Sequence, residues 1–229
     1  MRFDIITVFP EAFESYLNAS IIKRAQERGR ISVRLHGLRK WGIGRHRQLD
    51  DKPYGGGAGM VLMAEPILRA VKGLKLNVKS RGVKIIILSA KGKQFNQKMA
   101  RDWARRYDHL ILISGRYEGI DERVKRILKA EEISIGPYVL TDGDVAAMAV
   151  ISAVARLIPG VIRLESLQEE SHWNLLLGRE AREGAKGLEY PHYTRPEVLR
   201  WKGKLHRVPK ALLSGNHRRI AEWRTRRQR

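Results

Sequence analysis

Short apolar runs alternate with helical patterns along this chain, and that alternation limits the fold to few architectures. Val83–Leu88 (VKIIIL) and Leu110–Ser114 (LILIS) are each nearly continuous in apolar residues. Runs of this length, bounded by turn-forming residues, are typical of strands that are covered on both faces. A helical pattern over Asn96–Tyr107 separates them. The sequence therefore favours an α/β fold with a mostly parallel sheet.

The same reasoning extends over residues 1–160, which we expect to form one α/β domain. Further strands are predicted at Arg2–Val8, Ile31–Leu35 and Glu132–Ile135. Helices are predicted at Glu11–Asn18, Ser20–Arg28, Ala64–Leu74, Glu122–Lys129 and Asp144–Leu157. Asp144 is a suitable N-cap for the last of these helices.

Charge divides the chain unevenly. The net charge is +21, and the stretch from Arg195 to Arg229 holds 12 Lys and Arg residues against 2 Asp and Glu residues. Charge of this size indicates a polyanionic partner. We expect a polar linker over residues 161–187 and a small, basic, helical domain over residues 188–229 that binds RNA.

Several classes of protein are disfavoured. The chain has no cysteine, which excludes disulfides, thiolate metal sites and thiol catalysis, and suits a reducing compartment. No apolar run approaches the roughly 18 residues that a membrane span needs, and the N-terminus does not resemble a signal peptide. A cytoplasmic protein without membrane contact is the expectation.

Four glycine-centred segments are the candidates for binding a ligand. They are Asp50–Met60, Ser89–Lys93, Gly115–Asp121 and Ile135–Asp144. The last three follow predicted strands, and open α/β sheets bind ligands at the carboxyl ends of their strands. None contains G-x-G-x-x-G or the P-loop sequence. Each segment alone could equally be a tight turn.

Together these motifs resemble one family. GRYEGIDERV (Gly115–Val124), ISIGPYVLTDGD (Ile133–Asp144), DDKPYGGGAGM (Asp50–Met60), YPHYTRPEV (Tyr190–Val198) and LLSGNHRRIAEWR (Leu212–Arg224) are similar, in order, to the TrmD family of bacterial tRNA (guanine-N1)-methyltransferases. The resemblance covers nearly the whole chain and is carried by five motifs rather than by any single one.

The resemblance implies a fold, a reaction and partners. The family belongs to the SPOUT methyltransferases, so a deep trefoil knot in the α/β domain is expected, against the general rarity of knots. It also implies S-adenosyl-L-methionine as methyl donor, tRNA as substrate with methylation of the guanosine at position 37, and a homodimer whose active sites lie between subunits.

The resemblance further implies a set of residues around the methyl donor. They are Ser89, Gly115, Tyr117, Glu118, Gly119, Ile135, Gly136, Pro137, Tyr138, Val139, Leu140 and Gly143. Glycines there would permit close approach of backbones. Glu118 is expected either to face the positive sulfonium or to be an ordinary solvated carboxylate.

Two further residues match the family's catalytic positions. Methylation of N1 needs a base for its proton and a positive group for the charge on O6. Glu170 matches the position of the base, where the family usually has Asp, and Arg156 matches that of the arginine. Glu169 and His172 are alternative bases.

Other departures from the family concern the loops. Ala90 replaces the usual Pro, Asp142 the usual Gly, and Asp144 a frequent Glu. Mg²⁺ is associated with the family's reaction, and Asp50 with Asp51 could serve it or simply form a turn. No residue is assigned as a direct metal ligand.

Two other functions compete with this interpretation. A non-enzymatic RNA-binding or ribosome-assembly protein would explain the basic tail but not three glycine-rich loops after strands. A related methyltransferase acting on another nucleotide would explain the loops but not the TRPEV and SGNH segments.

Overall fold

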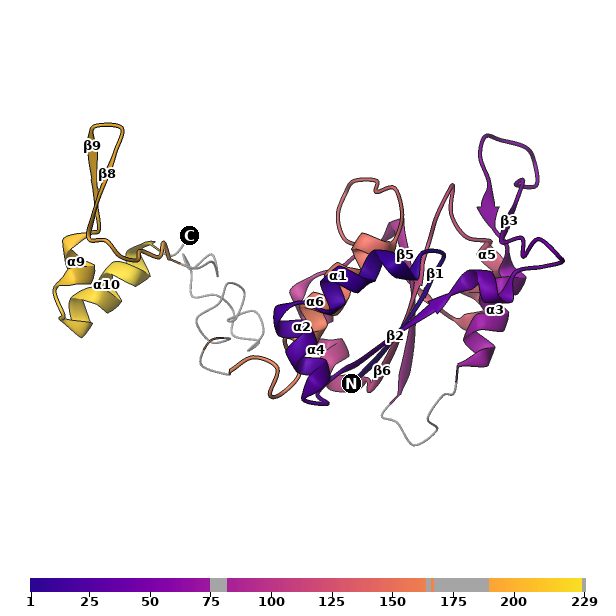
Figure 1. The fold of residues 1–229 in the computed structure, drawn as a ribbon, viewed down its shortest axis with the longest axis horizontal. Coiled ribbons are helices and arrows are strands. Elements are labelled where there is room, and N and C mark those ends of the chain that lie inside the picture. The colour runs from indigo at the N-terminus through magenta and orange to yellow at the C-terminus, as the bar shows by residue number, and fades with distance from the viewer. Residues whose placement is uncertain (75–81, 164–165, 167–189, 228–229) are drawn as a thin grey trace. The chain divides into compact units, whose positions relative to one another are not determined.

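The computed structural model describes residues 1–74, 82–163, 166 and 190–227 (Figure 1). By its internal contacts the chain divides into two compact units, Met1–Ile162 and Arg163–Arg229. The boundary follows Ile162, close to the end of the expected α/β domain. Most of the predicted linker, residues 161–187, lies outside the described residues.

The first unit is built on a five-stranded parallel sheet, as predicted. Its strands are β1 (Arg2–Thr7), β2 (Ser32–Gly37), β5 (Val83–Gln94), β6 (His109–Ser114) and β7 (Glu131–Ser134). They lie in the order β2-β1-β6-β5-β7, and every neighbouring pair is parallel. The central strands β1, β6 and β5 hold the longest apolar runs because both of their faces are covered.

Helices cover both faces of the sheet (Figure 1). One face packs against α1 (Glu14–Leu17), α2 (Ser20–Glu27), α4 (Gln97–Arg106) and α6 (Asp144–Ala155). The other packs against α3 (Ala64–Gly73) and α5 (Glu122–Leu128), with η2 (Leu38–Trp41) beside them. Phe3 and Ile5 of β1 point to the first face and Ile6 to the second, as alternation in a strand requires.

Local sequence signals explain where two of these helices begin. The Asn96 side chain accepts a hydrogen bond of 3.0 Å from the N–H of Met99 and caps α4. The Asp121 side chain accepts one of 2.9 Å from the N–H of Arg123 and caps α5. Both contacts satisfy a backbone donor that the first turn of a helix leaves unpaired.

The structure corrects the prediction that Asp144 caps α6. The N-cap position is held by Gly143, and Asp144 is the first helical residue with its side chain buried. Its carboxylate accepts a hydrogen bond of 2.7 Å from the hydroxyl of Thr7. The capping contact comes instead from Asp142, whose Oδ1 accepts a hydrogen bond of 2.9 Å from the N–H of Asp144.

The segment Ser89–Lys93 also differs from its prediction as a loop that follows a strand. It lies inside β5, which continues to Gln94. Ile133 of β7 is paired with both Leu88 and Lys93, so the residues between them form an irregularity in the ladder. A Cβ on Gly92 would lie 2.4 Å from the backbone nitrogen of Ile133, so the irregularity brings two backbones together.

Two smaller differences concern the first half of the chain. The helix predicted over Glu11–Asn18 is divided into η1 (Pro10–Phe13) and the short α1. A two-stranded antiparallel ribbon of β3 (Asp50–Asp51) and β4 (Val61–Leu62) flanks the first glycine-rich loop, and the sequence did not indicate it.

The second unit is not wholly helical, contrary to the prediction. It contains an antiparallel hairpin of β8 (Val198–Trp201) and β9 (Lys204–Arg207), followed by α9 (Lys210–Leu213) and α10 (His217–Arg227). Lys202 and Gly203 form the hairpin turn and both have positive φ angles, 48° and 74°. Within the described part of the chain, no helix is long and apolar enough to cross a membrane.

Candidate functional site

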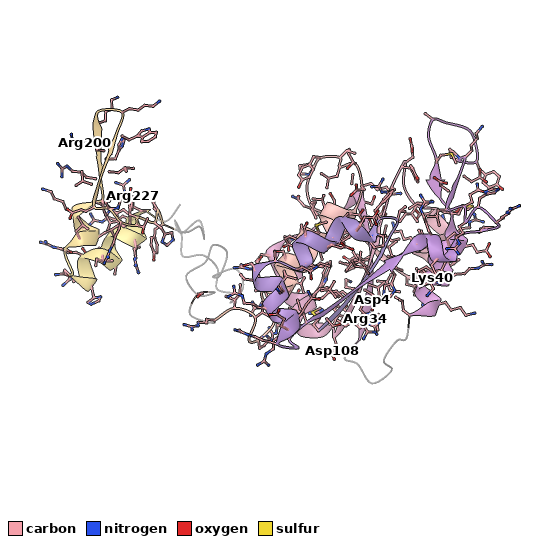
Figure 2. The ribbon with its side chains drawn as sticks, viewed as in Figure 1. Asp4, Arg34, Lys40, Asp108, Arg200 and Arg227 are labelled. Carbon is pink, nitrogen blue, oxygen red and sulfur yellow. The ribbon has the colours of Figure 1, made fainter. Side chains whose placement is uncertain are left out.

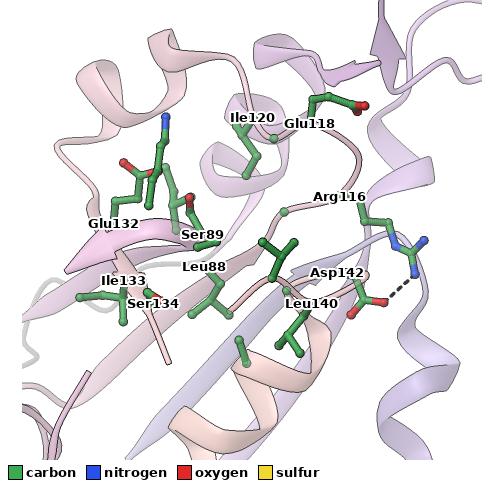
Figure 3. A pocket seen from close by; sticks show the side chains of 18 of the residues that line it. Leu88, Ser89, Arg116, Glu118, Ile120, Glu132, Ile133, Ser134, Leu140 and Asp142 are labelled. Carbon is green, nitrogen blue, oxygen red and sulfur yellow. Dashed lines mark hydrogen bonds and ion pairs between the residues drawn. The ribbon is translucent and has the colours of Figure 1, made fainter. Parts of the chain in front are cut away.

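A cavity of about 420 Å³ opens at the carboxyl ends of β6 and β7, beside the irregular part of β5. Four segments line it, with Lys125 and Ala146 beside them: Ile87–Lys91, Gly115–Glu122, Glu132–Ile135 and Tyr138–Gly143 (Figure 3). Its volume is that of a small-ligand pocket, and its place in the sheet is where ligands of open α/β folds bind.

The cavity brings together most of the residues that the resemblance assigned to the methyl donor. Ten of the twelve line it: Ser89, Gly115, Tyr117, Glu118, Gly119, Ile135, Tyr138, Val139, Leu140 and Gly143. Gly136 and Pro137 do not. That these residues bind S-adenosylmethionine stays a prediction.

Two glycines allow the loops of the cavity to touch through their backbones. A Cβ on Gly115 would lie 3.1 Å from the carbonyl oxygen of Leu88, and a Cβ on Gly143 would lie 2.8 Å from the nitrogen of Gly115. Gly119 is glycine for a different reason. A Cβ there would meet nothing within 4 Å, but its φ is +131°, which other residues rarely adopt. Close packing therefore explains Gly115 and Gly143, and backbone conformation explains Gly119.

The turn after β7 holds the apolar rim of the cavity. Ser134 donates from its hydroxyl to the carbonyl of Gly136 at 2.7 Å and accepts from the N–H of Gly136 at 3.2 Å. The N–H of Tyr138 donates to the same carbonyl at 2.9 Å. This turn leaves Tyr138 53% exposed and Val139 84% exposed. Large apolar side chains so exposed favour a further binding partner at this rim.

Glu118 connects the first glycine-rich loop to the cavity. Its Oε2 accepts a hydrogen bond of 3.3 Å from the N–H of Met60, and its own N–H donates to the carbonyl of Met60 at 3.2 Å. The carboxylate fills the space that a Cβ on Gly59 would need. Glu118 thus has a partner in this structure, while its exposed side chain still lines the cavity.

Tyr117 is held in an unusual conformation beside Asp50. Its φ angle is +56°, which non-glycine residues rarely adopt. Burial, followed by the hydrogen bond to Asp50, raises the pKa of the Tyr117 phenol. Asp51, the other acidic residue considered for Mg²⁺, accepts a hydrogen bond of 2.8 Å from the N–H of Lys52. Among the described residues no group of three or more His, Cys, Asp or Glu side chains could hold a metal ion.

The sequence reasoning missed an ion cluster at the edge of the cavity. Lys125 Nζ lies 2.8 Å from Glu132 Oε2, and Lys91 Nζ lies 3.6 Å from Glu132 Oε1. Burial opposes ionisation of Glu132, but hydrogen bonds from Lys125 and Ser89 outweigh it and lower the pKa of this carboxyl. Glu132 begins the predicted strand Glu132–Ile135, so it was not among the carboxyl strand ends where a ligand was expected.

Of the two catalytic candidates, the structure describes only Arg156, which does not line the cavity. Arg156 is the C-cap of α6 and is half-buried. The 12 residues of this helix span about 18 Å at 1.5 Å per residue, so Arg156 lies at the end of the helix remote from Gly143. Glu170, together with Glu169 and His172, lies outside the described residues.

Comparisons with known proteins identify the family of the chain. A family model described as tRNA (Guanine-1)-methyltransferase TrmD matches residues 1–229. The chain is 51% identical to a tRNA (guanine-N(1)-)-methyltransferase of Chloroflexus aggregans over 98% of this chain and 81% of the relative. It is 51% identical to that of Thermomicrobium roseum, over 98% and 77%.

A third relative extends the agreement to the whole chain. The protein of the same name from Citrifermentans bemidjiense is 44% identical over 100% of this chain and 85% of its own length. The order of the motifs and the full-length match both indicate the same family. The chain belongs to the tRNA (guanine-1)-methyltransferase TrmD family.

Proposed function

We propose that this chain transfers a methyl group from S-adenosyl-L-methionine to N1 of the guanosine at position 37 of tRNA, next to the anticodon. Membership of the family supports the reaction on guanine N1 of tRNA. The observation that carries the proposal is the cavity at the strand ends, where the backbones of Gly115 and Gly143 meet.

The residues of the cavity fit S-adenosylmethionine. Ile120, Ile135 and Leu140, all partly or fully exposed, supply apolar surface for an adenine ring, and the loop backbones supply hydrogen-bonding groups. The carboxylates of Glu118 and Glu132 supply negative charge in a cavity that would receive a positive sulfonium. When bound, this donor supplies the activated methyl group, so the protein needs no covalent intermediate of its own.

The chain's own residues have two tasks in the reaction. N1 of neutral guanine carries a proton, and Glu170 is proposed to remove it as the general base. Negative charge develops on O6 as that proton leaves, and Arg156 is proposed to stabilise it. Mg²⁺ is expected from the family. The described residues hold no group of three or more His, Cys, Asp or Glu side chains for it, and neither task uses it.

A homodimer with active sites between subunits explains why Arg156 is remote from the cavity. A second copy would bring its own Arg156, and Glu170 with it, to a cavity that Arg156 of the same chain does not line. The exposed apolar rim, Tyr138 and Val139 with Val145, offers a surface that such a copy would cover. Sedimentation should show a dimer. Mixing Arg156→Ala subunits with Gly143→Ala subunits should restore activity, because one site of each mixed dimer keeps both functional parts.

The second unit is proposed to bind the tRNA. Its hairpin carries four exposed cations, Arg200, Lys202, Lys204 and Arg207, of which Arg200 is labelled in Figure 2. Positive charge at this density binds phosphates and releases counterions. Because the substrate is tRNA, the site of action proposed is the cytoplasm.

A trefoil knot is proposed for the region around the cavity. What supports it is the close crossing of backbones there: the N–H of Gly143 donates to the carbonyl of Gly115, and Gly92 lies against Ile133. An experimental structure with S-adenosylhomocysteine, traced through both loops, tests the threading.

One experiment tests the function directly. Purified chain, S-adenosylmethionine labelled in its methyl group and tRNA with guanosine at position 37 should yield 1-methylguanosine at that nucleotide. A tRNA with adenosine at position 37 is the matched control and should stay unlabelled. Tight tRNA binding without any transfer would instead support a non-enzymatic RNA-binding protein, and methylation elsewhere in the tRNA would support a different methyltransferase.

A further inference from the structure

Two charged side chains join the loop after β6 to the loop after β7. Arg116 Nη2 donates a hydrogen bond of 3.0 Å to Asp142 Oδ2, and both residues line the cavity (Figure 3). The two side chains are only 26% and 13% exposed. Water screens such a pair less than it screens an ion pair on the open surface.

Asp142 makes more contacts than the ion pair alone. Its Oδ1 accepts from the N–H of Asp144 at 2.9 Å, which caps α6, and its Oδ2 also accepts from the hydroxyl of Thr141 at 3.2 Å. One carboxylate therefore determines both where the helix begins and where the loop before it lies.

Arg116 is held on its other side by an aromatic ring. Its guanidinium lies 4.3 Å from the ring centroid of Phe9, which follows β1. The N–H of Phe9 donates to the hydroxyl oxygen of Thr7 at 3.1 Å, and that hydroxyl donates to the buried carboxylate of Asp144 at 2.7 Å. Phe9, Thr7, Asp144, Asp142 and Arg116 thus form a closed ring of contacts, which we call the latch.

We propose that the latch is a positioning device that sets the affinity of the cavity for adenosyl ligands, with Arg116 and Asp142 as its positioning pair. The inference rests on the proposed function and deepens it. Gly143 lies between the two aspartates of the latch, and its N–H bonds to Gly115. The latch therefore fixes the backbone where the two cavity loops meet.

The reason to expect an effect on binding is conformational. The segment from Ile135 to Gly143 has no regular secondary structure, and its Val139 is 84% exposed. Without the latch this segment would have to be ordered when the ligand binds, and ordering costs affinity. A pre-formed loop avoids that cost, so breaking the latch should weaken binding more than it slows methyl transfer at saturation.

The first test isolates the ion pair from the helix cap. Asp142→Asn keeps an oxygen acceptor for the N–H of Asp144, since Asn caps helices as well as Asp does, but it removes the charge that faces Arg116. Arg116→Gln removes the other charge. Each variant should bind S-adenosylhomocysteine about 10-fold more weakly in calorimetry, the order expected for a charge-assisted contact that is partly solvated.

The double variant Arg116→Gln/Asp142→Asn distinguishes a latch from two separate contributions. If the two residues act as one contact, the double variant should bind S-adenosylhomocysteine about as tightly as whichever single variant has the lower affinity. Arg116→Lys should give a partial loss, because it keeps the charge but not the planar group over Phe9. In steady state the KM for S-adenosylmethionine should rise about 10-fold, while kcat at saturation stays within about 2-fold of the unaltered chain.

A matched ion pair on the surface provides the control. Glu65 and Arg69 form a pair on α3, and both are more than half exposed. Glu65→Gln and Arg69→Gln should leave the affinity unchanged. Unchanged affinity in Asp142→Asn, or losses that simply add in the double variant, would overturn the latch. If the unaltered chain bound no S-adenosylhomocysteine, the proposed function itself would fail, which is a different result.

Discussion

The N–H of Gly143 donates a hydrogen bond of 2.9 Å to the carbonyl of Gly115, so two loops of the cavity meet backbone to backbone. The φ of Gly143 is −85°, an angle that any residue can adopt. Its requirement for glycine is therefore one of space, because a Cβ would lie 2.8 Å from the Gly115 nitrogen and 3.1 Å from Ser114 Cα. Both of these neighbours are backbone atoms at the end of β6, which cannot move aside as a flexible side chain could.

Gly143→Ala should consequently destabilise the first unit and weaken its ligand site together. Overpacking of this kind typically costs about 1–3 kcal/mol. Chemical denaturation should report that loss, and calorimetry with S-adenosylhomocysteine should show weaker binding. Gly73→Ala is the control, since a Cβ there would make only ordinary contacts with Trp41 and would favour the helix. If Gly143→Ala were as stable as the unaltered chain, the backbones at Gly143 and Gly115 would have to be farther apart than the structure shows.

A second prediction concerns Asp4 of β1, which is labelled in Figure 2 and is fully buried. Burial opposes its ionisation, but hydrogen bonds with His109, His36 and Arg2 outweigh burial and hold the pKa of this carboxyl far below its usual range. Asp4→Asn should cost about 3 kcal/mol or more at neutral pH, because partners of a buried charge are left unpaired.

The effect of Asp4 should depend on pH with a definite sign. A depressed folded pKa gives stability that is present above the unfolded pKa of about 3.9 and is lost as the pH falls through the folded pKa. Urea denaturation at several pH values should therefore show the gap between the unaltered chain and Asp4→Asn narrowing below about pH 4. Glu27→Gln, in an exposed pair with Lys23, should show no such gap at any pH.

The sheet could be predicted from the sequence because burial on both faces forces each central strand to be apolar. Leu110, Ile111, Leu112 and Ile113 are all fully buried, and their run is what identified β6. The ligand loops were found for a related reason, since close backbone contact at Gly115 and Gly143 excludes a side chain.

Features that depend on contacts between distant residues could not be predicted. The hairpin Val198–Arg207 was missed because its strands have only four residues each and none of its side chains is buried, so no core contact marks them. The latch joins Arg116 to a residue 26 positions away, and no periodicity connects them. Asp142 was noted only as a departure from the family, while its role as the cap of α6 required the geometry.

A third prediction concerns Trp201, which is 63% exposed on the hairpin. It pairs across the strands with Lys204, so an aromatic face and a positive charge lie on the same side of the ribbon. If RNA bases stack there, Trp201→Ala should weaken tRNA binding by about 1–3 kcal/mol, and Trp201→Phe should lose less. Anisotropy with a labelled anticodon stem-loop measures this.

The hairpin also offers a matched control for Trp201. Leu205 is 49% exposed and pairs with Arg200, which places it on the opposite face of the ribbon. Leu205→Ala should leave RNA affinity nearly unchanged, and neither variant should alter S-adenosylhomocysteine binding. Equal losses in both variants would indicate that the hairpin folds poorly when altered, and no loss in either would place the RNA elsewhere on the second unit.

The last prediction concerns the proton on guanine N1. If Glu170 removes it while Arg156 stabilises O6, both act mainly in the transition state, so their loss should lower turnover and leave binding nearly unchanged. Glu170→Gln should lose about 10²–10⁴-fold in rate, the usual value of general-base assistance. Glu170→Asp should retain more activity because it keeps a carboxylate. Single-turnover methyl transfer to tRNA with guanosine at position 37, measured across pH, gives the rates.

Neighbouring residues make this prediction sharp. Glu169→Gln should be mild, because adjacent residues rarely point at the same atom, and His172→Ala should likewise retain most of the rate. A nearly unaltered rate in Glu170→Gln with a dead Glu169→Gln or His172→Ala would move the base to that neighbour. A mixing experiment tests whether one subunit of the dimer supplies both residues to a site. If it does, mixing Glu170→Gln subunits with Arg156→Ala subunits should not restore activity, because every site would lack either Glu170 or Arg156.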